Sequence, residues 1–172
     1  MTGRITLFTD SAPGIRLRAI GPEDLEELRV WKNANREFFF YKELIDPEMQ
    51  RAWYEGYLKR PGDFMFIVEA EGRKAGCLGF RLQGEEADGY NIIGLPEFHG
   101  RGIMRSAMRL MCSFARAEKA PRVSLKVLKK NPAIAWYEKC GFDKVGEAHD
   151  HLIMALGKNF VPCPYQAEKL QS

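Results

Sequence analysis

Residues 94–105 read GLPEFHGRGIMR and join the end of a predicted strand to the start of a predicted helix. Gly100 and Gly102 let the backbone turn tightly at this place. Successive N–H groups at the start of the helix then point into one space, beside the positive end of the helix dipole. Such a turn favours an anion, most naturally a phosphate or pyrophosphate, and Arg101 and Arg105 add positive charge at its mouth. The alternative is a plain turn that needs glycine only for its conformation.

Around this turn the hydrophobic pattern predicts a mixed α/β fold. Strands are expected at residues 15–19, 64–68, 75–82, 89–95, 123–128, 143–147 and 152–156. Helices are expected from Pro22, from Pro47 after the N-cap Asp46, over 102–119 and over 131–139. A run of antiparallel strands followed by a strand-helix-strand crossover predicts a twisted, mostly antiparallel mixed sheet covered by helices.

The length of 172 residues fits one domain, which we expect to span residues 1–157. Residues 158–172 contain two prolines and show no periodicity. They are expected to form a mobile or loosely docked C-terminal tail.

Composition excludes several classes of protein. The net charge of +3, with acids and bases interspersed, does not indicate a nucleic-acid binder. No apolar run is long enough to cross a membrane, and no signal peptide is apparent, so a cytoplasmic protein is expected. The cysteines are too far apart for a metal site and are expected to be reduced, at Cys77, Cys112, Cys140 and Cys163.

A second informative stretch, residues 131–142, reads NPAIAWYEKCGF. Asn131 is expected to cap a short helix that ends at Gly141, the position where glycine commonly follows a helix. The Tyr137 side chain is either a packing residue or a functional one. Its place beside the predicted anion site favours function.

Together the two stretches resemble the GNAT superfamily of acyl-CoA N-acyltransferases, and the resemblance covers roughly residues 15–156. The phosphate-binding signature of that family is Gln/Arg-x-x-Gly-x-Gly/Ala. Residues 99–104 read HGRGIM, so that Gly102 matches it while His99 and Met104 depart from it. The segment with Asn131, Tyr137, Gly141 and Phe142 matches well.

The resemblance implies a sheet with a splayed pair of strands and a bound acetyl-CoA, without a metal. The pyrophosphate would lie on the N–H groups of residues 99–104, and the pantetheine arm would run along strand 89–95, opened by a bulge at Gly94. A backbone N–H near Ile93 would stabilise the oxyanion. Tyr137 aligns with the general acid of the family. The residues expected to bind the cofactor are Ile93, Leu95, His99, Gly100, Arg101, Gly102, Ile103, Met104, Arg105 and Asn131.

The general base is less apparent in the sequence. The family often places a glutamate near the start of the bulged strand, and here Asp88 stands next to that place. Asp88 is therefore the candidate base. The alternatives are a proton relayed by water and an acidic run, GEEADG, that only forms a turn.

The amine acceptor is expected to meet the first 60 residues. Four consecutive aromatic residues either line a cleft or interface or belong to a loop folded over the core: Phe38, Phe39, Phe40 and Tyr41. The region resembles branches that acetylate nucleotide-linked amino sugars or the N-termini of ribosomal proteins, and the aromatic planes favour the sugar. A non-catalytic acyl-CoA-binding module, or an enzyme that modifies a macromolecule, is the alternative. The exposed aromatic segment makes a homodimer a further expectation.

Overall fold

The structure is a computed structural model that describes residues 4–170. Its helices are α1 (Leu25–Ala34), α2 (Pro47–Lys59), α3 (Ile103–Glu118) and α4 (Ile134–Lys139). Its strands are β1 (Ile5–Phe8), β2 (Ile15–Ala19), β3 (Asp63–Ala70), β4 (Arg73–Gln83), β5 (Glu86–Gly94), β6 (Arg122–Leu128), β7 (Phe142–Glu147), β8 (His151–Leu156) and β9 (Gln166–Lys169).

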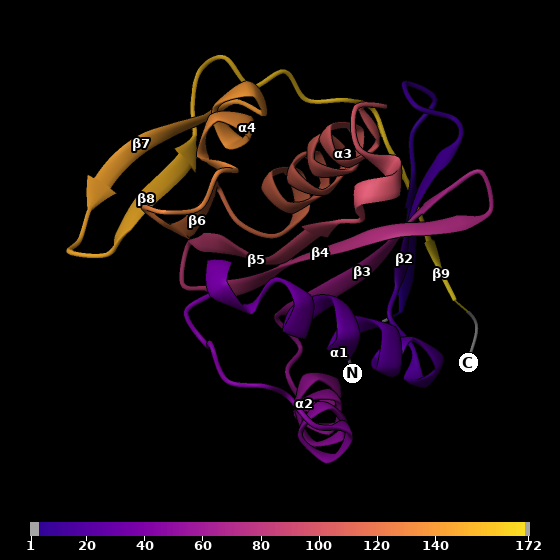
Figure 1. Cartoon of the computed structure of the whole chain (residues 1–172). Coiled ribbons are helices and arrows are strands. Elements are labelled where there is room, and N and C mark those ends of the chain that lie inside the picture. The colour runs from indigo at the N-terminus through magenta and orange to yellow at the C-terminus, as the bar shows by residue number, and fades with distance from the viewer. Residues whose placement is uncertain (1–3, 171–172) are drawn as a thin grey trace.

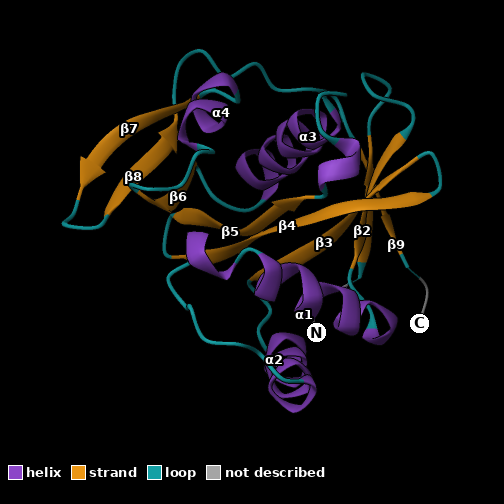
Figure 2. Cartoon of the chain, viewed as in Figure 1, coloured by secondary structure: helices purple, strands orange, loops and turns teal. Residues whose placement is uncertain are grey.

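The described strands form one mixed sheet in the order β7-β8-β6-β5-β4-β3-β2-β1-β9. Helices α3 and α4 cover one face, and α1 and α2 cover the other (Figures 1 and 2). All neighbouring pairs are antiparallel except β5 and β6, which run parallel. The predicted fold class is confirmed.

Strands β5 and β6 pair only over their first residues. Their register runs from Glu86 opposite Arg122 to Gly89 opposite Leu125. Beyond that point β5 continues to Gly94 beside β4, whereas β6 continues beside β8. The two strands therefore splay apart, as the family resemblance implied, and the opening between them lies at the centre of the sheet.

Alternation along β3 divides the core into two layers. Phe66 and Val68 pack with α3 in the larger cluster, while Met65 and Ile67 pack with α1 and α2 in the smaller one. All four side chains are buried. Successive residues of a strand point to opposite faces, so that a central strand with helices on both sides reads as a continuous apolar run.

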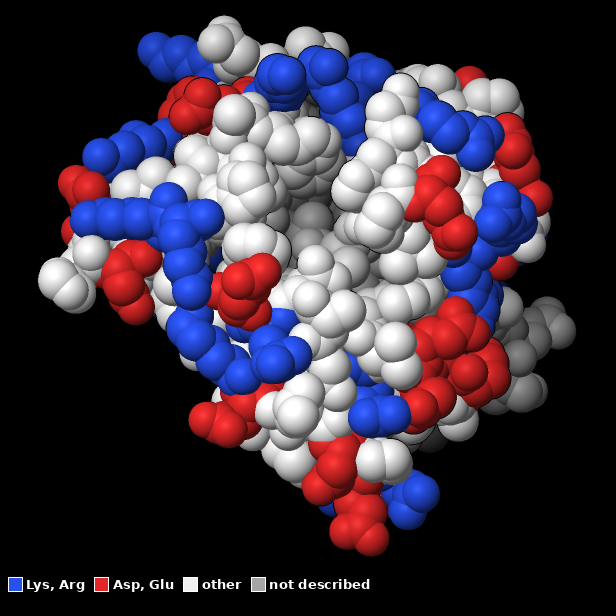
Figure 3. Space-filling view, viewed as in Figure 1, with Lys and Arg blue, Asp and Glu red and all other residues white. Residues whose placement is uncertain are grey.

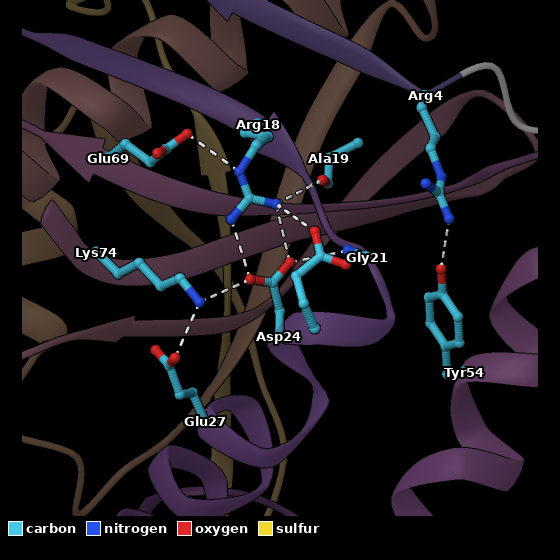
Figure 4. Close-up of polar contacts among 10 residues, drawn as sticks. Arg4, Arg18, Ala19, Gly21, Asp24, Glu27, Tyr54, Glu69 and Lys74 are labelled. Carbon is cyan, nitrogen blue, oxygen red and sulfur yellow. Dashed lines mark hydrogen bonds and ion pairs between the residues drawn. The ribbon is translucent and has the colours of Figure 1, made fainter. Parts of the chain in front are cut away.

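A buried carboxylate attaches the start of α1 to the sheet (Figure 4). Asp24 is fully buried and accepts from both terminal nitrogens of the Arg18 guanidinium, at 2.9 and 3.0 Å. The backbone N–H of Gly21 donates to it at 2.8 Å, and the Lys74 ammonium lies 3.0 Å away. These contacts connect β2, β4 and the turn before α1.

The bulge in β5 lies at Asn91 rather than at Gly94, where the sequence analysis expected it. Cys77 pairs with Ile93 and Gly79 with Tyr90, so that two residues of β5 stand opposite one residue of β4. Asn91 takes a left-handed backbone conformation, with φ of 48°. Asparagine tolerates that region better than most residues, whereas Gly94 remains paired with Gly76.

The C-terminal segment is docked, contrary to the expected loose tail. Phe160 and Cys163 are buried in the larger core cluster, and β9 pairs with β1 along the edge of the sheet. Neither β1 nor the edge strand β9 was predicted, because each has only four residues and lacks a clear turn signal. The contact joins the two ends of the described chain.

Candidate active site

A cavity of about 720 Å³ occupies the opening between β5 and β6 and extends beneath α1. Figure 3 shows a hollow whose visible walls are mostly uncharged, with Lys and Arg side chains along its upper rim. The cavity brings together predicted residues from five parts of the chain. These are Phe38, Phe39, Phe40, Tyr41, Asp88, Ile93, His99, Asn131 and Tyr137.

Tyr137, on α4, is one of the residues that line this cavity. The residue is 7% exposed, and its ring makes edge contacts with Trp136 and Phe142. No residue within 4–170 forms a hydrogen bond with the hydroxyl. Burial raises the pKa of Tyr137 well above its usual range, so the phenol is protonated at neutral pH and can donate a proton.

Asp88 lies within β5, not in the preceding turn, because the strand begins at Glu86. Its position opposite Ser124 is the last but one at which β5 and β6 pair. Burial raises the pKa of Asp88, while the nearby charges of Lys126 and Arg81 oppose that shift. A carboxylate with a raised pKa, at the head of the cavity, is suited to accept a proton.

The predicted anion turn has the expected backbone geometry. Gly100 and Gly102 have φ of 79° and 72°, and no atom lies within 4 Å of a Cβ built on either residue. Helix α3 begins at Ile103, directly after the second glycine. The turn thus leaves open space in front of the first N–H groups of α3.

Several residues predicted to bind the cofactor surround this turn but do not line the cavity. The Arg101 guanidinium contacts both carboxylate oxygens of Glu71 at 3.1 Å, so its charge is already paired. Ile103 is buried in the core, and the N–H of Leu95 donates to the carbonyl of Ala75. Arg105 affects the Cys140 thiol on α4 electrostatically. The Ile103 side chain and the Leu95 N–H are therefore already engaged within the protein.

Three further predicted residues make local contacts. The His99 ring lies 3.2 Å from the carbonyl of Gly94, and the Met104 side chain packs against the same glycine. Asn131 accepts from the N–H of Ala133 at 2.9 Å in the turn before α4. It is not the helix cap that the sequence predicted, because α4 begins at Ile134 and its N-cap position is Ala133.

The aromatic segment, residues 38–41, lines the cavity at the end away from the glycine turn. Phe39 lies beneath the Lys32 ammonium, 3.4 Å from the ring centre, and Phe40 makes an edge contact with His151. Phe40 and Tyr41 remain 52% and 47% exposed. The segment is thus a wall of the cavity, one of the two arrangements that the sequence left open.

Sequence reasoning missed Lys32, Arg81 and Asn91, all of which line the cavity. Lys32 donates a hydrogen bond to the side-chain oxygen of Asn91 at the bulge. Burial lowers the pKa of Lys32 to about 8. The available signal was helical spacing, since Lys32 stands four residues after the buried Leu28 and therefore on the same face of α1.

No helix within 4–170 has the length and apolar character needed to span a membrane. No group of three His, Cys, Asp or Glu side chains in that range is arranged to hold a metal ion.

Comparisons with known proteins agree with the fold. The chain is 27% identical to the spermidine N(1)-acetyltransferase of Escherichia coli K12, over 93% of this chain and 90% of that protein. A spermidine N-acetyltransferase from Vibrio cholerae, solved with CoA and spermine, superimposes with a TM-score of 0.70 at 22% identity, covering 83% of this chain and 94% of that one. The ribosomal L7/L12 acetyltransferase RimL, solved with CoA, gives a TM-score of 0.67 at 19% identity, covering 91% and 94%.

The family model for the acetyltransferase (GNAT) family matches residues 26–142, which include the splayed strands, the glycine turn and Tyr137. The chain therefore belongs to the GNAT family of acetyltransferases, enzymes that use acetyl-CoA as the acyl donor.

Proposed function

We propose that this enzyme transfers the acetyl group of acetyl-CoA directly to a primary amine in the cavity between β5 and β6. The observation that carries the proposal is the common cavity of Tyr137 and Asp88, at the point where the strands separate. An acid and a base that face one space can serve both ends of an acyl transfer.

The donor would span the opening from the glycine turn to the bulge. The open space at Gly100 and Gly102 suits a pyrophosphate on the first N–H groups of α3. The pantetheine arm would run along the free edge of β5, and the thioester would lie near Ile93, where a backbone N–H polarises its carbonyl. We also retain Asn131 as a contact of the arm, since it lines the cavity.

In the proposed reaction Asp88 accepts a proton from the ammonium group, directly or through water, because only the neutral amine attacks. The nitrogen forms a bond to the acetyl carbon and the carbonyl oxygen becomes an oxyanion. When the C–S bond breaks, the sulfur leaves with the electron pair, and the Tyr137 hydroxyl protonates it. The products are the N-acetylated amine and CoA.

For the acceptor, the relatives favour a small amine over the nucleotide-linked amino sugar that the aromatic segment first indicated. The E. coli relative is named for spermidine, and it matches over nearly the whole chain. Spermidine is therefore one candidate acceptor, and a peptide N-terminus, as in RimL, is another. A homodimer and a cytoplasmic location remain predictions.

The proposal is tested by calorimetry with acetyl-CoA, followed by a transfer assay with labelled acetyl-CoA and a panel of amines. We expect binding of the thioester and label in an N-acetyl product. Binding with slow hydrolysis, but no transfer to any amine or peptide, would instead support a non-catalytic acyl-CoA-binding module.

Gly102→Asp is expected to weaken the binding of CoA by about tenfold or more. The new side chain would fill the open space at the turn with a negative charge, where the pyrophosphate is proposed to lie. Gly84→Asp is a matched control, because Gly84 also has a positive φ with open space around it but lies in a distant hairpin. Equal CoA affinity of Gly102→Asp and the unmodified enzyme, by calorimetry, would place the pyrophosphate elsewhere.

Asp88→Asn is expected to lower kcat/KM at neutral pH by roughly tenfold, with recovery at high pH, where the amine is already neutral. Glu86→Gln is the control, since Glu86 lies on the same strand but contacts Ser124 and Arg122 rather than the cavity. If the pH profile of Asp88→Asn parallels that of the unmodified enzyme, Asp88 is not the base, and water alone accepts the proton from the amine.

Phe39→Ala is expected to raise the KM of the acceptor several-fold while leaving the affinity for acetyl-CoA within about twofold. Phe39 lies on the α1 side of the cavity, away from the glycine turn. Phe8→Ala is a suitable control, because Phe8 also lies near a cation, Arg16, but on the distant β1. The reverse result, weaker CoA binding with an unchanged acceptor KM, would argue against a role in acceptor binding.

A further inference from the structure

Lys32 is a cavity cation that has no carboxylate partner among the described residues. Its ammonium donates to the Asn91 side chain and lies over the Phe39 ring, and both of these partners are uncharged. The groups that affect it electrostatically are Cys77, a buried thiol, and Arg81, a second cation. Lys32 is partly buried, and an ammonium group removed from water usually has a counter-ion.

Arg81 adds a second incompletely satisfied cation to the same cavity. Its guanidinium lies 3.8 Å from the centre of the Tyr90 ring, and its Nε is buried without a hydrogen-bond partner in residues 4–170. The nearest carboxylate oxygen, on Asp63, is 3.5 Å from Nε. That carboxylate already accepts from Tyr90 and from Arg60, the latter at 2.9 Å.

The balance of charge in the cavity therefore favours an anion at its α1 end. Three basic side chains line it, Lys32, Arg81 and Lys126, against the single carboxylate of Asp88. A polycation such as spermidine would meet repulsion from Lys32 and Arg81. An amine that also carries a negative group would supply the missing counter-ion.

We propose that Lys32, assisted by Arg81, binds an anionic group, a phosphate or a carboxylate, of the amine acceptor. This inference rests on the proposed function for the amine, but the anion site can be tested without any acetyl transfer. Because Lys32 contacts the bulge residue Asn91, an anion held there would anchor a short acceptor close to the proposed position of the thioester.

The test measures binding by calorimetry to enzyme saturated with CoA, so that the pyrophosphate site is already filled. The ligands are O-phosphoethanolamine, β-alanine, ethanolamine and spermidine. We expect one or both anionic amines to bind at least about tenfold more tightly than ethanolamine and spermidine, since charged hydrogen bonds contribute most. The first two ligands distinguish a phosphate site from a carboxylate site.

Two variants separate charge from structure. Lys32→Gln can still donate to Asn91 but has no charge, and it is expected to lose the preference for anionic amines. Lys32→Arg keeps the charge and should retain most of it. Lys59→Met, at the exposed end of α2, is the control. Thermal melting confirms that each variant is folded.

The outcomes distinguish the anion site from the proposed function. Equal binding of ethanolamine and the anionic amines, or an unchanged preference in Lys32→Gln, overturns the anion site even if acetyl transfer occurs. Charge-dependent binding through Lys32 without any acetyl transfer supports the anion site and contradicts the proposed reaction.

Discussion

Tyr137→Phe is expected to lower kcat by about 10²-fold or more, the scale of a lost general acid, and to leave the Kd of acetyl-CoA nearly unchanged. The substitution removes one hydroxyl and keeps the ring, which packs against Trp136 and Phe142. The departing thiolate would then have to take its proton from water. Because burial keeps the pKa of Tyr137 high, the hydroxyl is a proton donor over the whole neutral range.

The measurement is steady-state kinetics together with calorimetry of acetyl-CoA binding. Tyr54→Phe is the matched control, since Tyr54 is also buried but its hydroxyl accepts a hydrogen bond from Arg4, outside the cavity. The control should retain full kcat. An unchanged kcat in Tyr137→Phe would remove this residue from the mechanism, and a large loss of CoA affinity would make it a binding residue.

Asp24→Ala is expected to destabilise the fold by about 3–5 kcal/mol, the range for removing one partner from a buried ion pair. The substitution leaves the Arg18 guanidinium, the Gly21 N–H and the Lys74 ammonium without their shared acceptor (Figure 4). Urea denaturation measures the change. Glu26→Ala is the control, because the pair of Glu26 with Arg29 is exposed to solvent and should contribute little to stability.

The same carboxylate should make the stability depend on acid pH. Burial alone would raise the pKa of Asp24, but hydrogen bonds from Arg18, Gly21 and Lys74 outweigh it and lower the pKa. A folded-state pKa below that of the unfolded chain stabilises the protein above about pH 4, and this contribution is lost as the pH falls through the folded-state value.

Asp24→Asn removes this titration while keeping the shape of the side chain. Its free energy of unfolding should therefore fall less steeply between about pH 4 and pH 2 than that of the unmodified protein. Parallel acid limbs for the two proteins would show that other carboxylates dominate acid unfolding.

Local signals in the sequence were reliable where one short segment decides its own conformation. Asp46 caps α2 through its side chain, and Gly141, after α4, has φ of 99°. Gly100 and Gly102 both adopt left-handed conformations before α3. Each of these features depends on interactions within a few residues, so the local sequence is enough to predict it.

Features that depend on distant partners were missed or misplaced. The bulge was expected at Gly94 because glycine is the usual residue for unusual backbone angles. It occurs instead at Asn91, where the Cys77 thiol donates to the backbone carbonyl and the Lys32 ammonium holds the side chain. Similarly, β9 pairs with the free edge of β1. No pattern within residues 158–172 predicts this pairing.

By itself the sequence determined the family, the order of the main elements and the candidates Tyr137 and Asp88, because these follow from short motifs and hydrophobic periodicity. Only the tertiary structure decided that Lys32 lines the same cavity as those candidates, without an ion-pair partner in residues 4–170. The physical reason is that the function of a charged side chain depends on the groups that contact it. For Lys32 these include Asn91, some 60 residues away in the sequence.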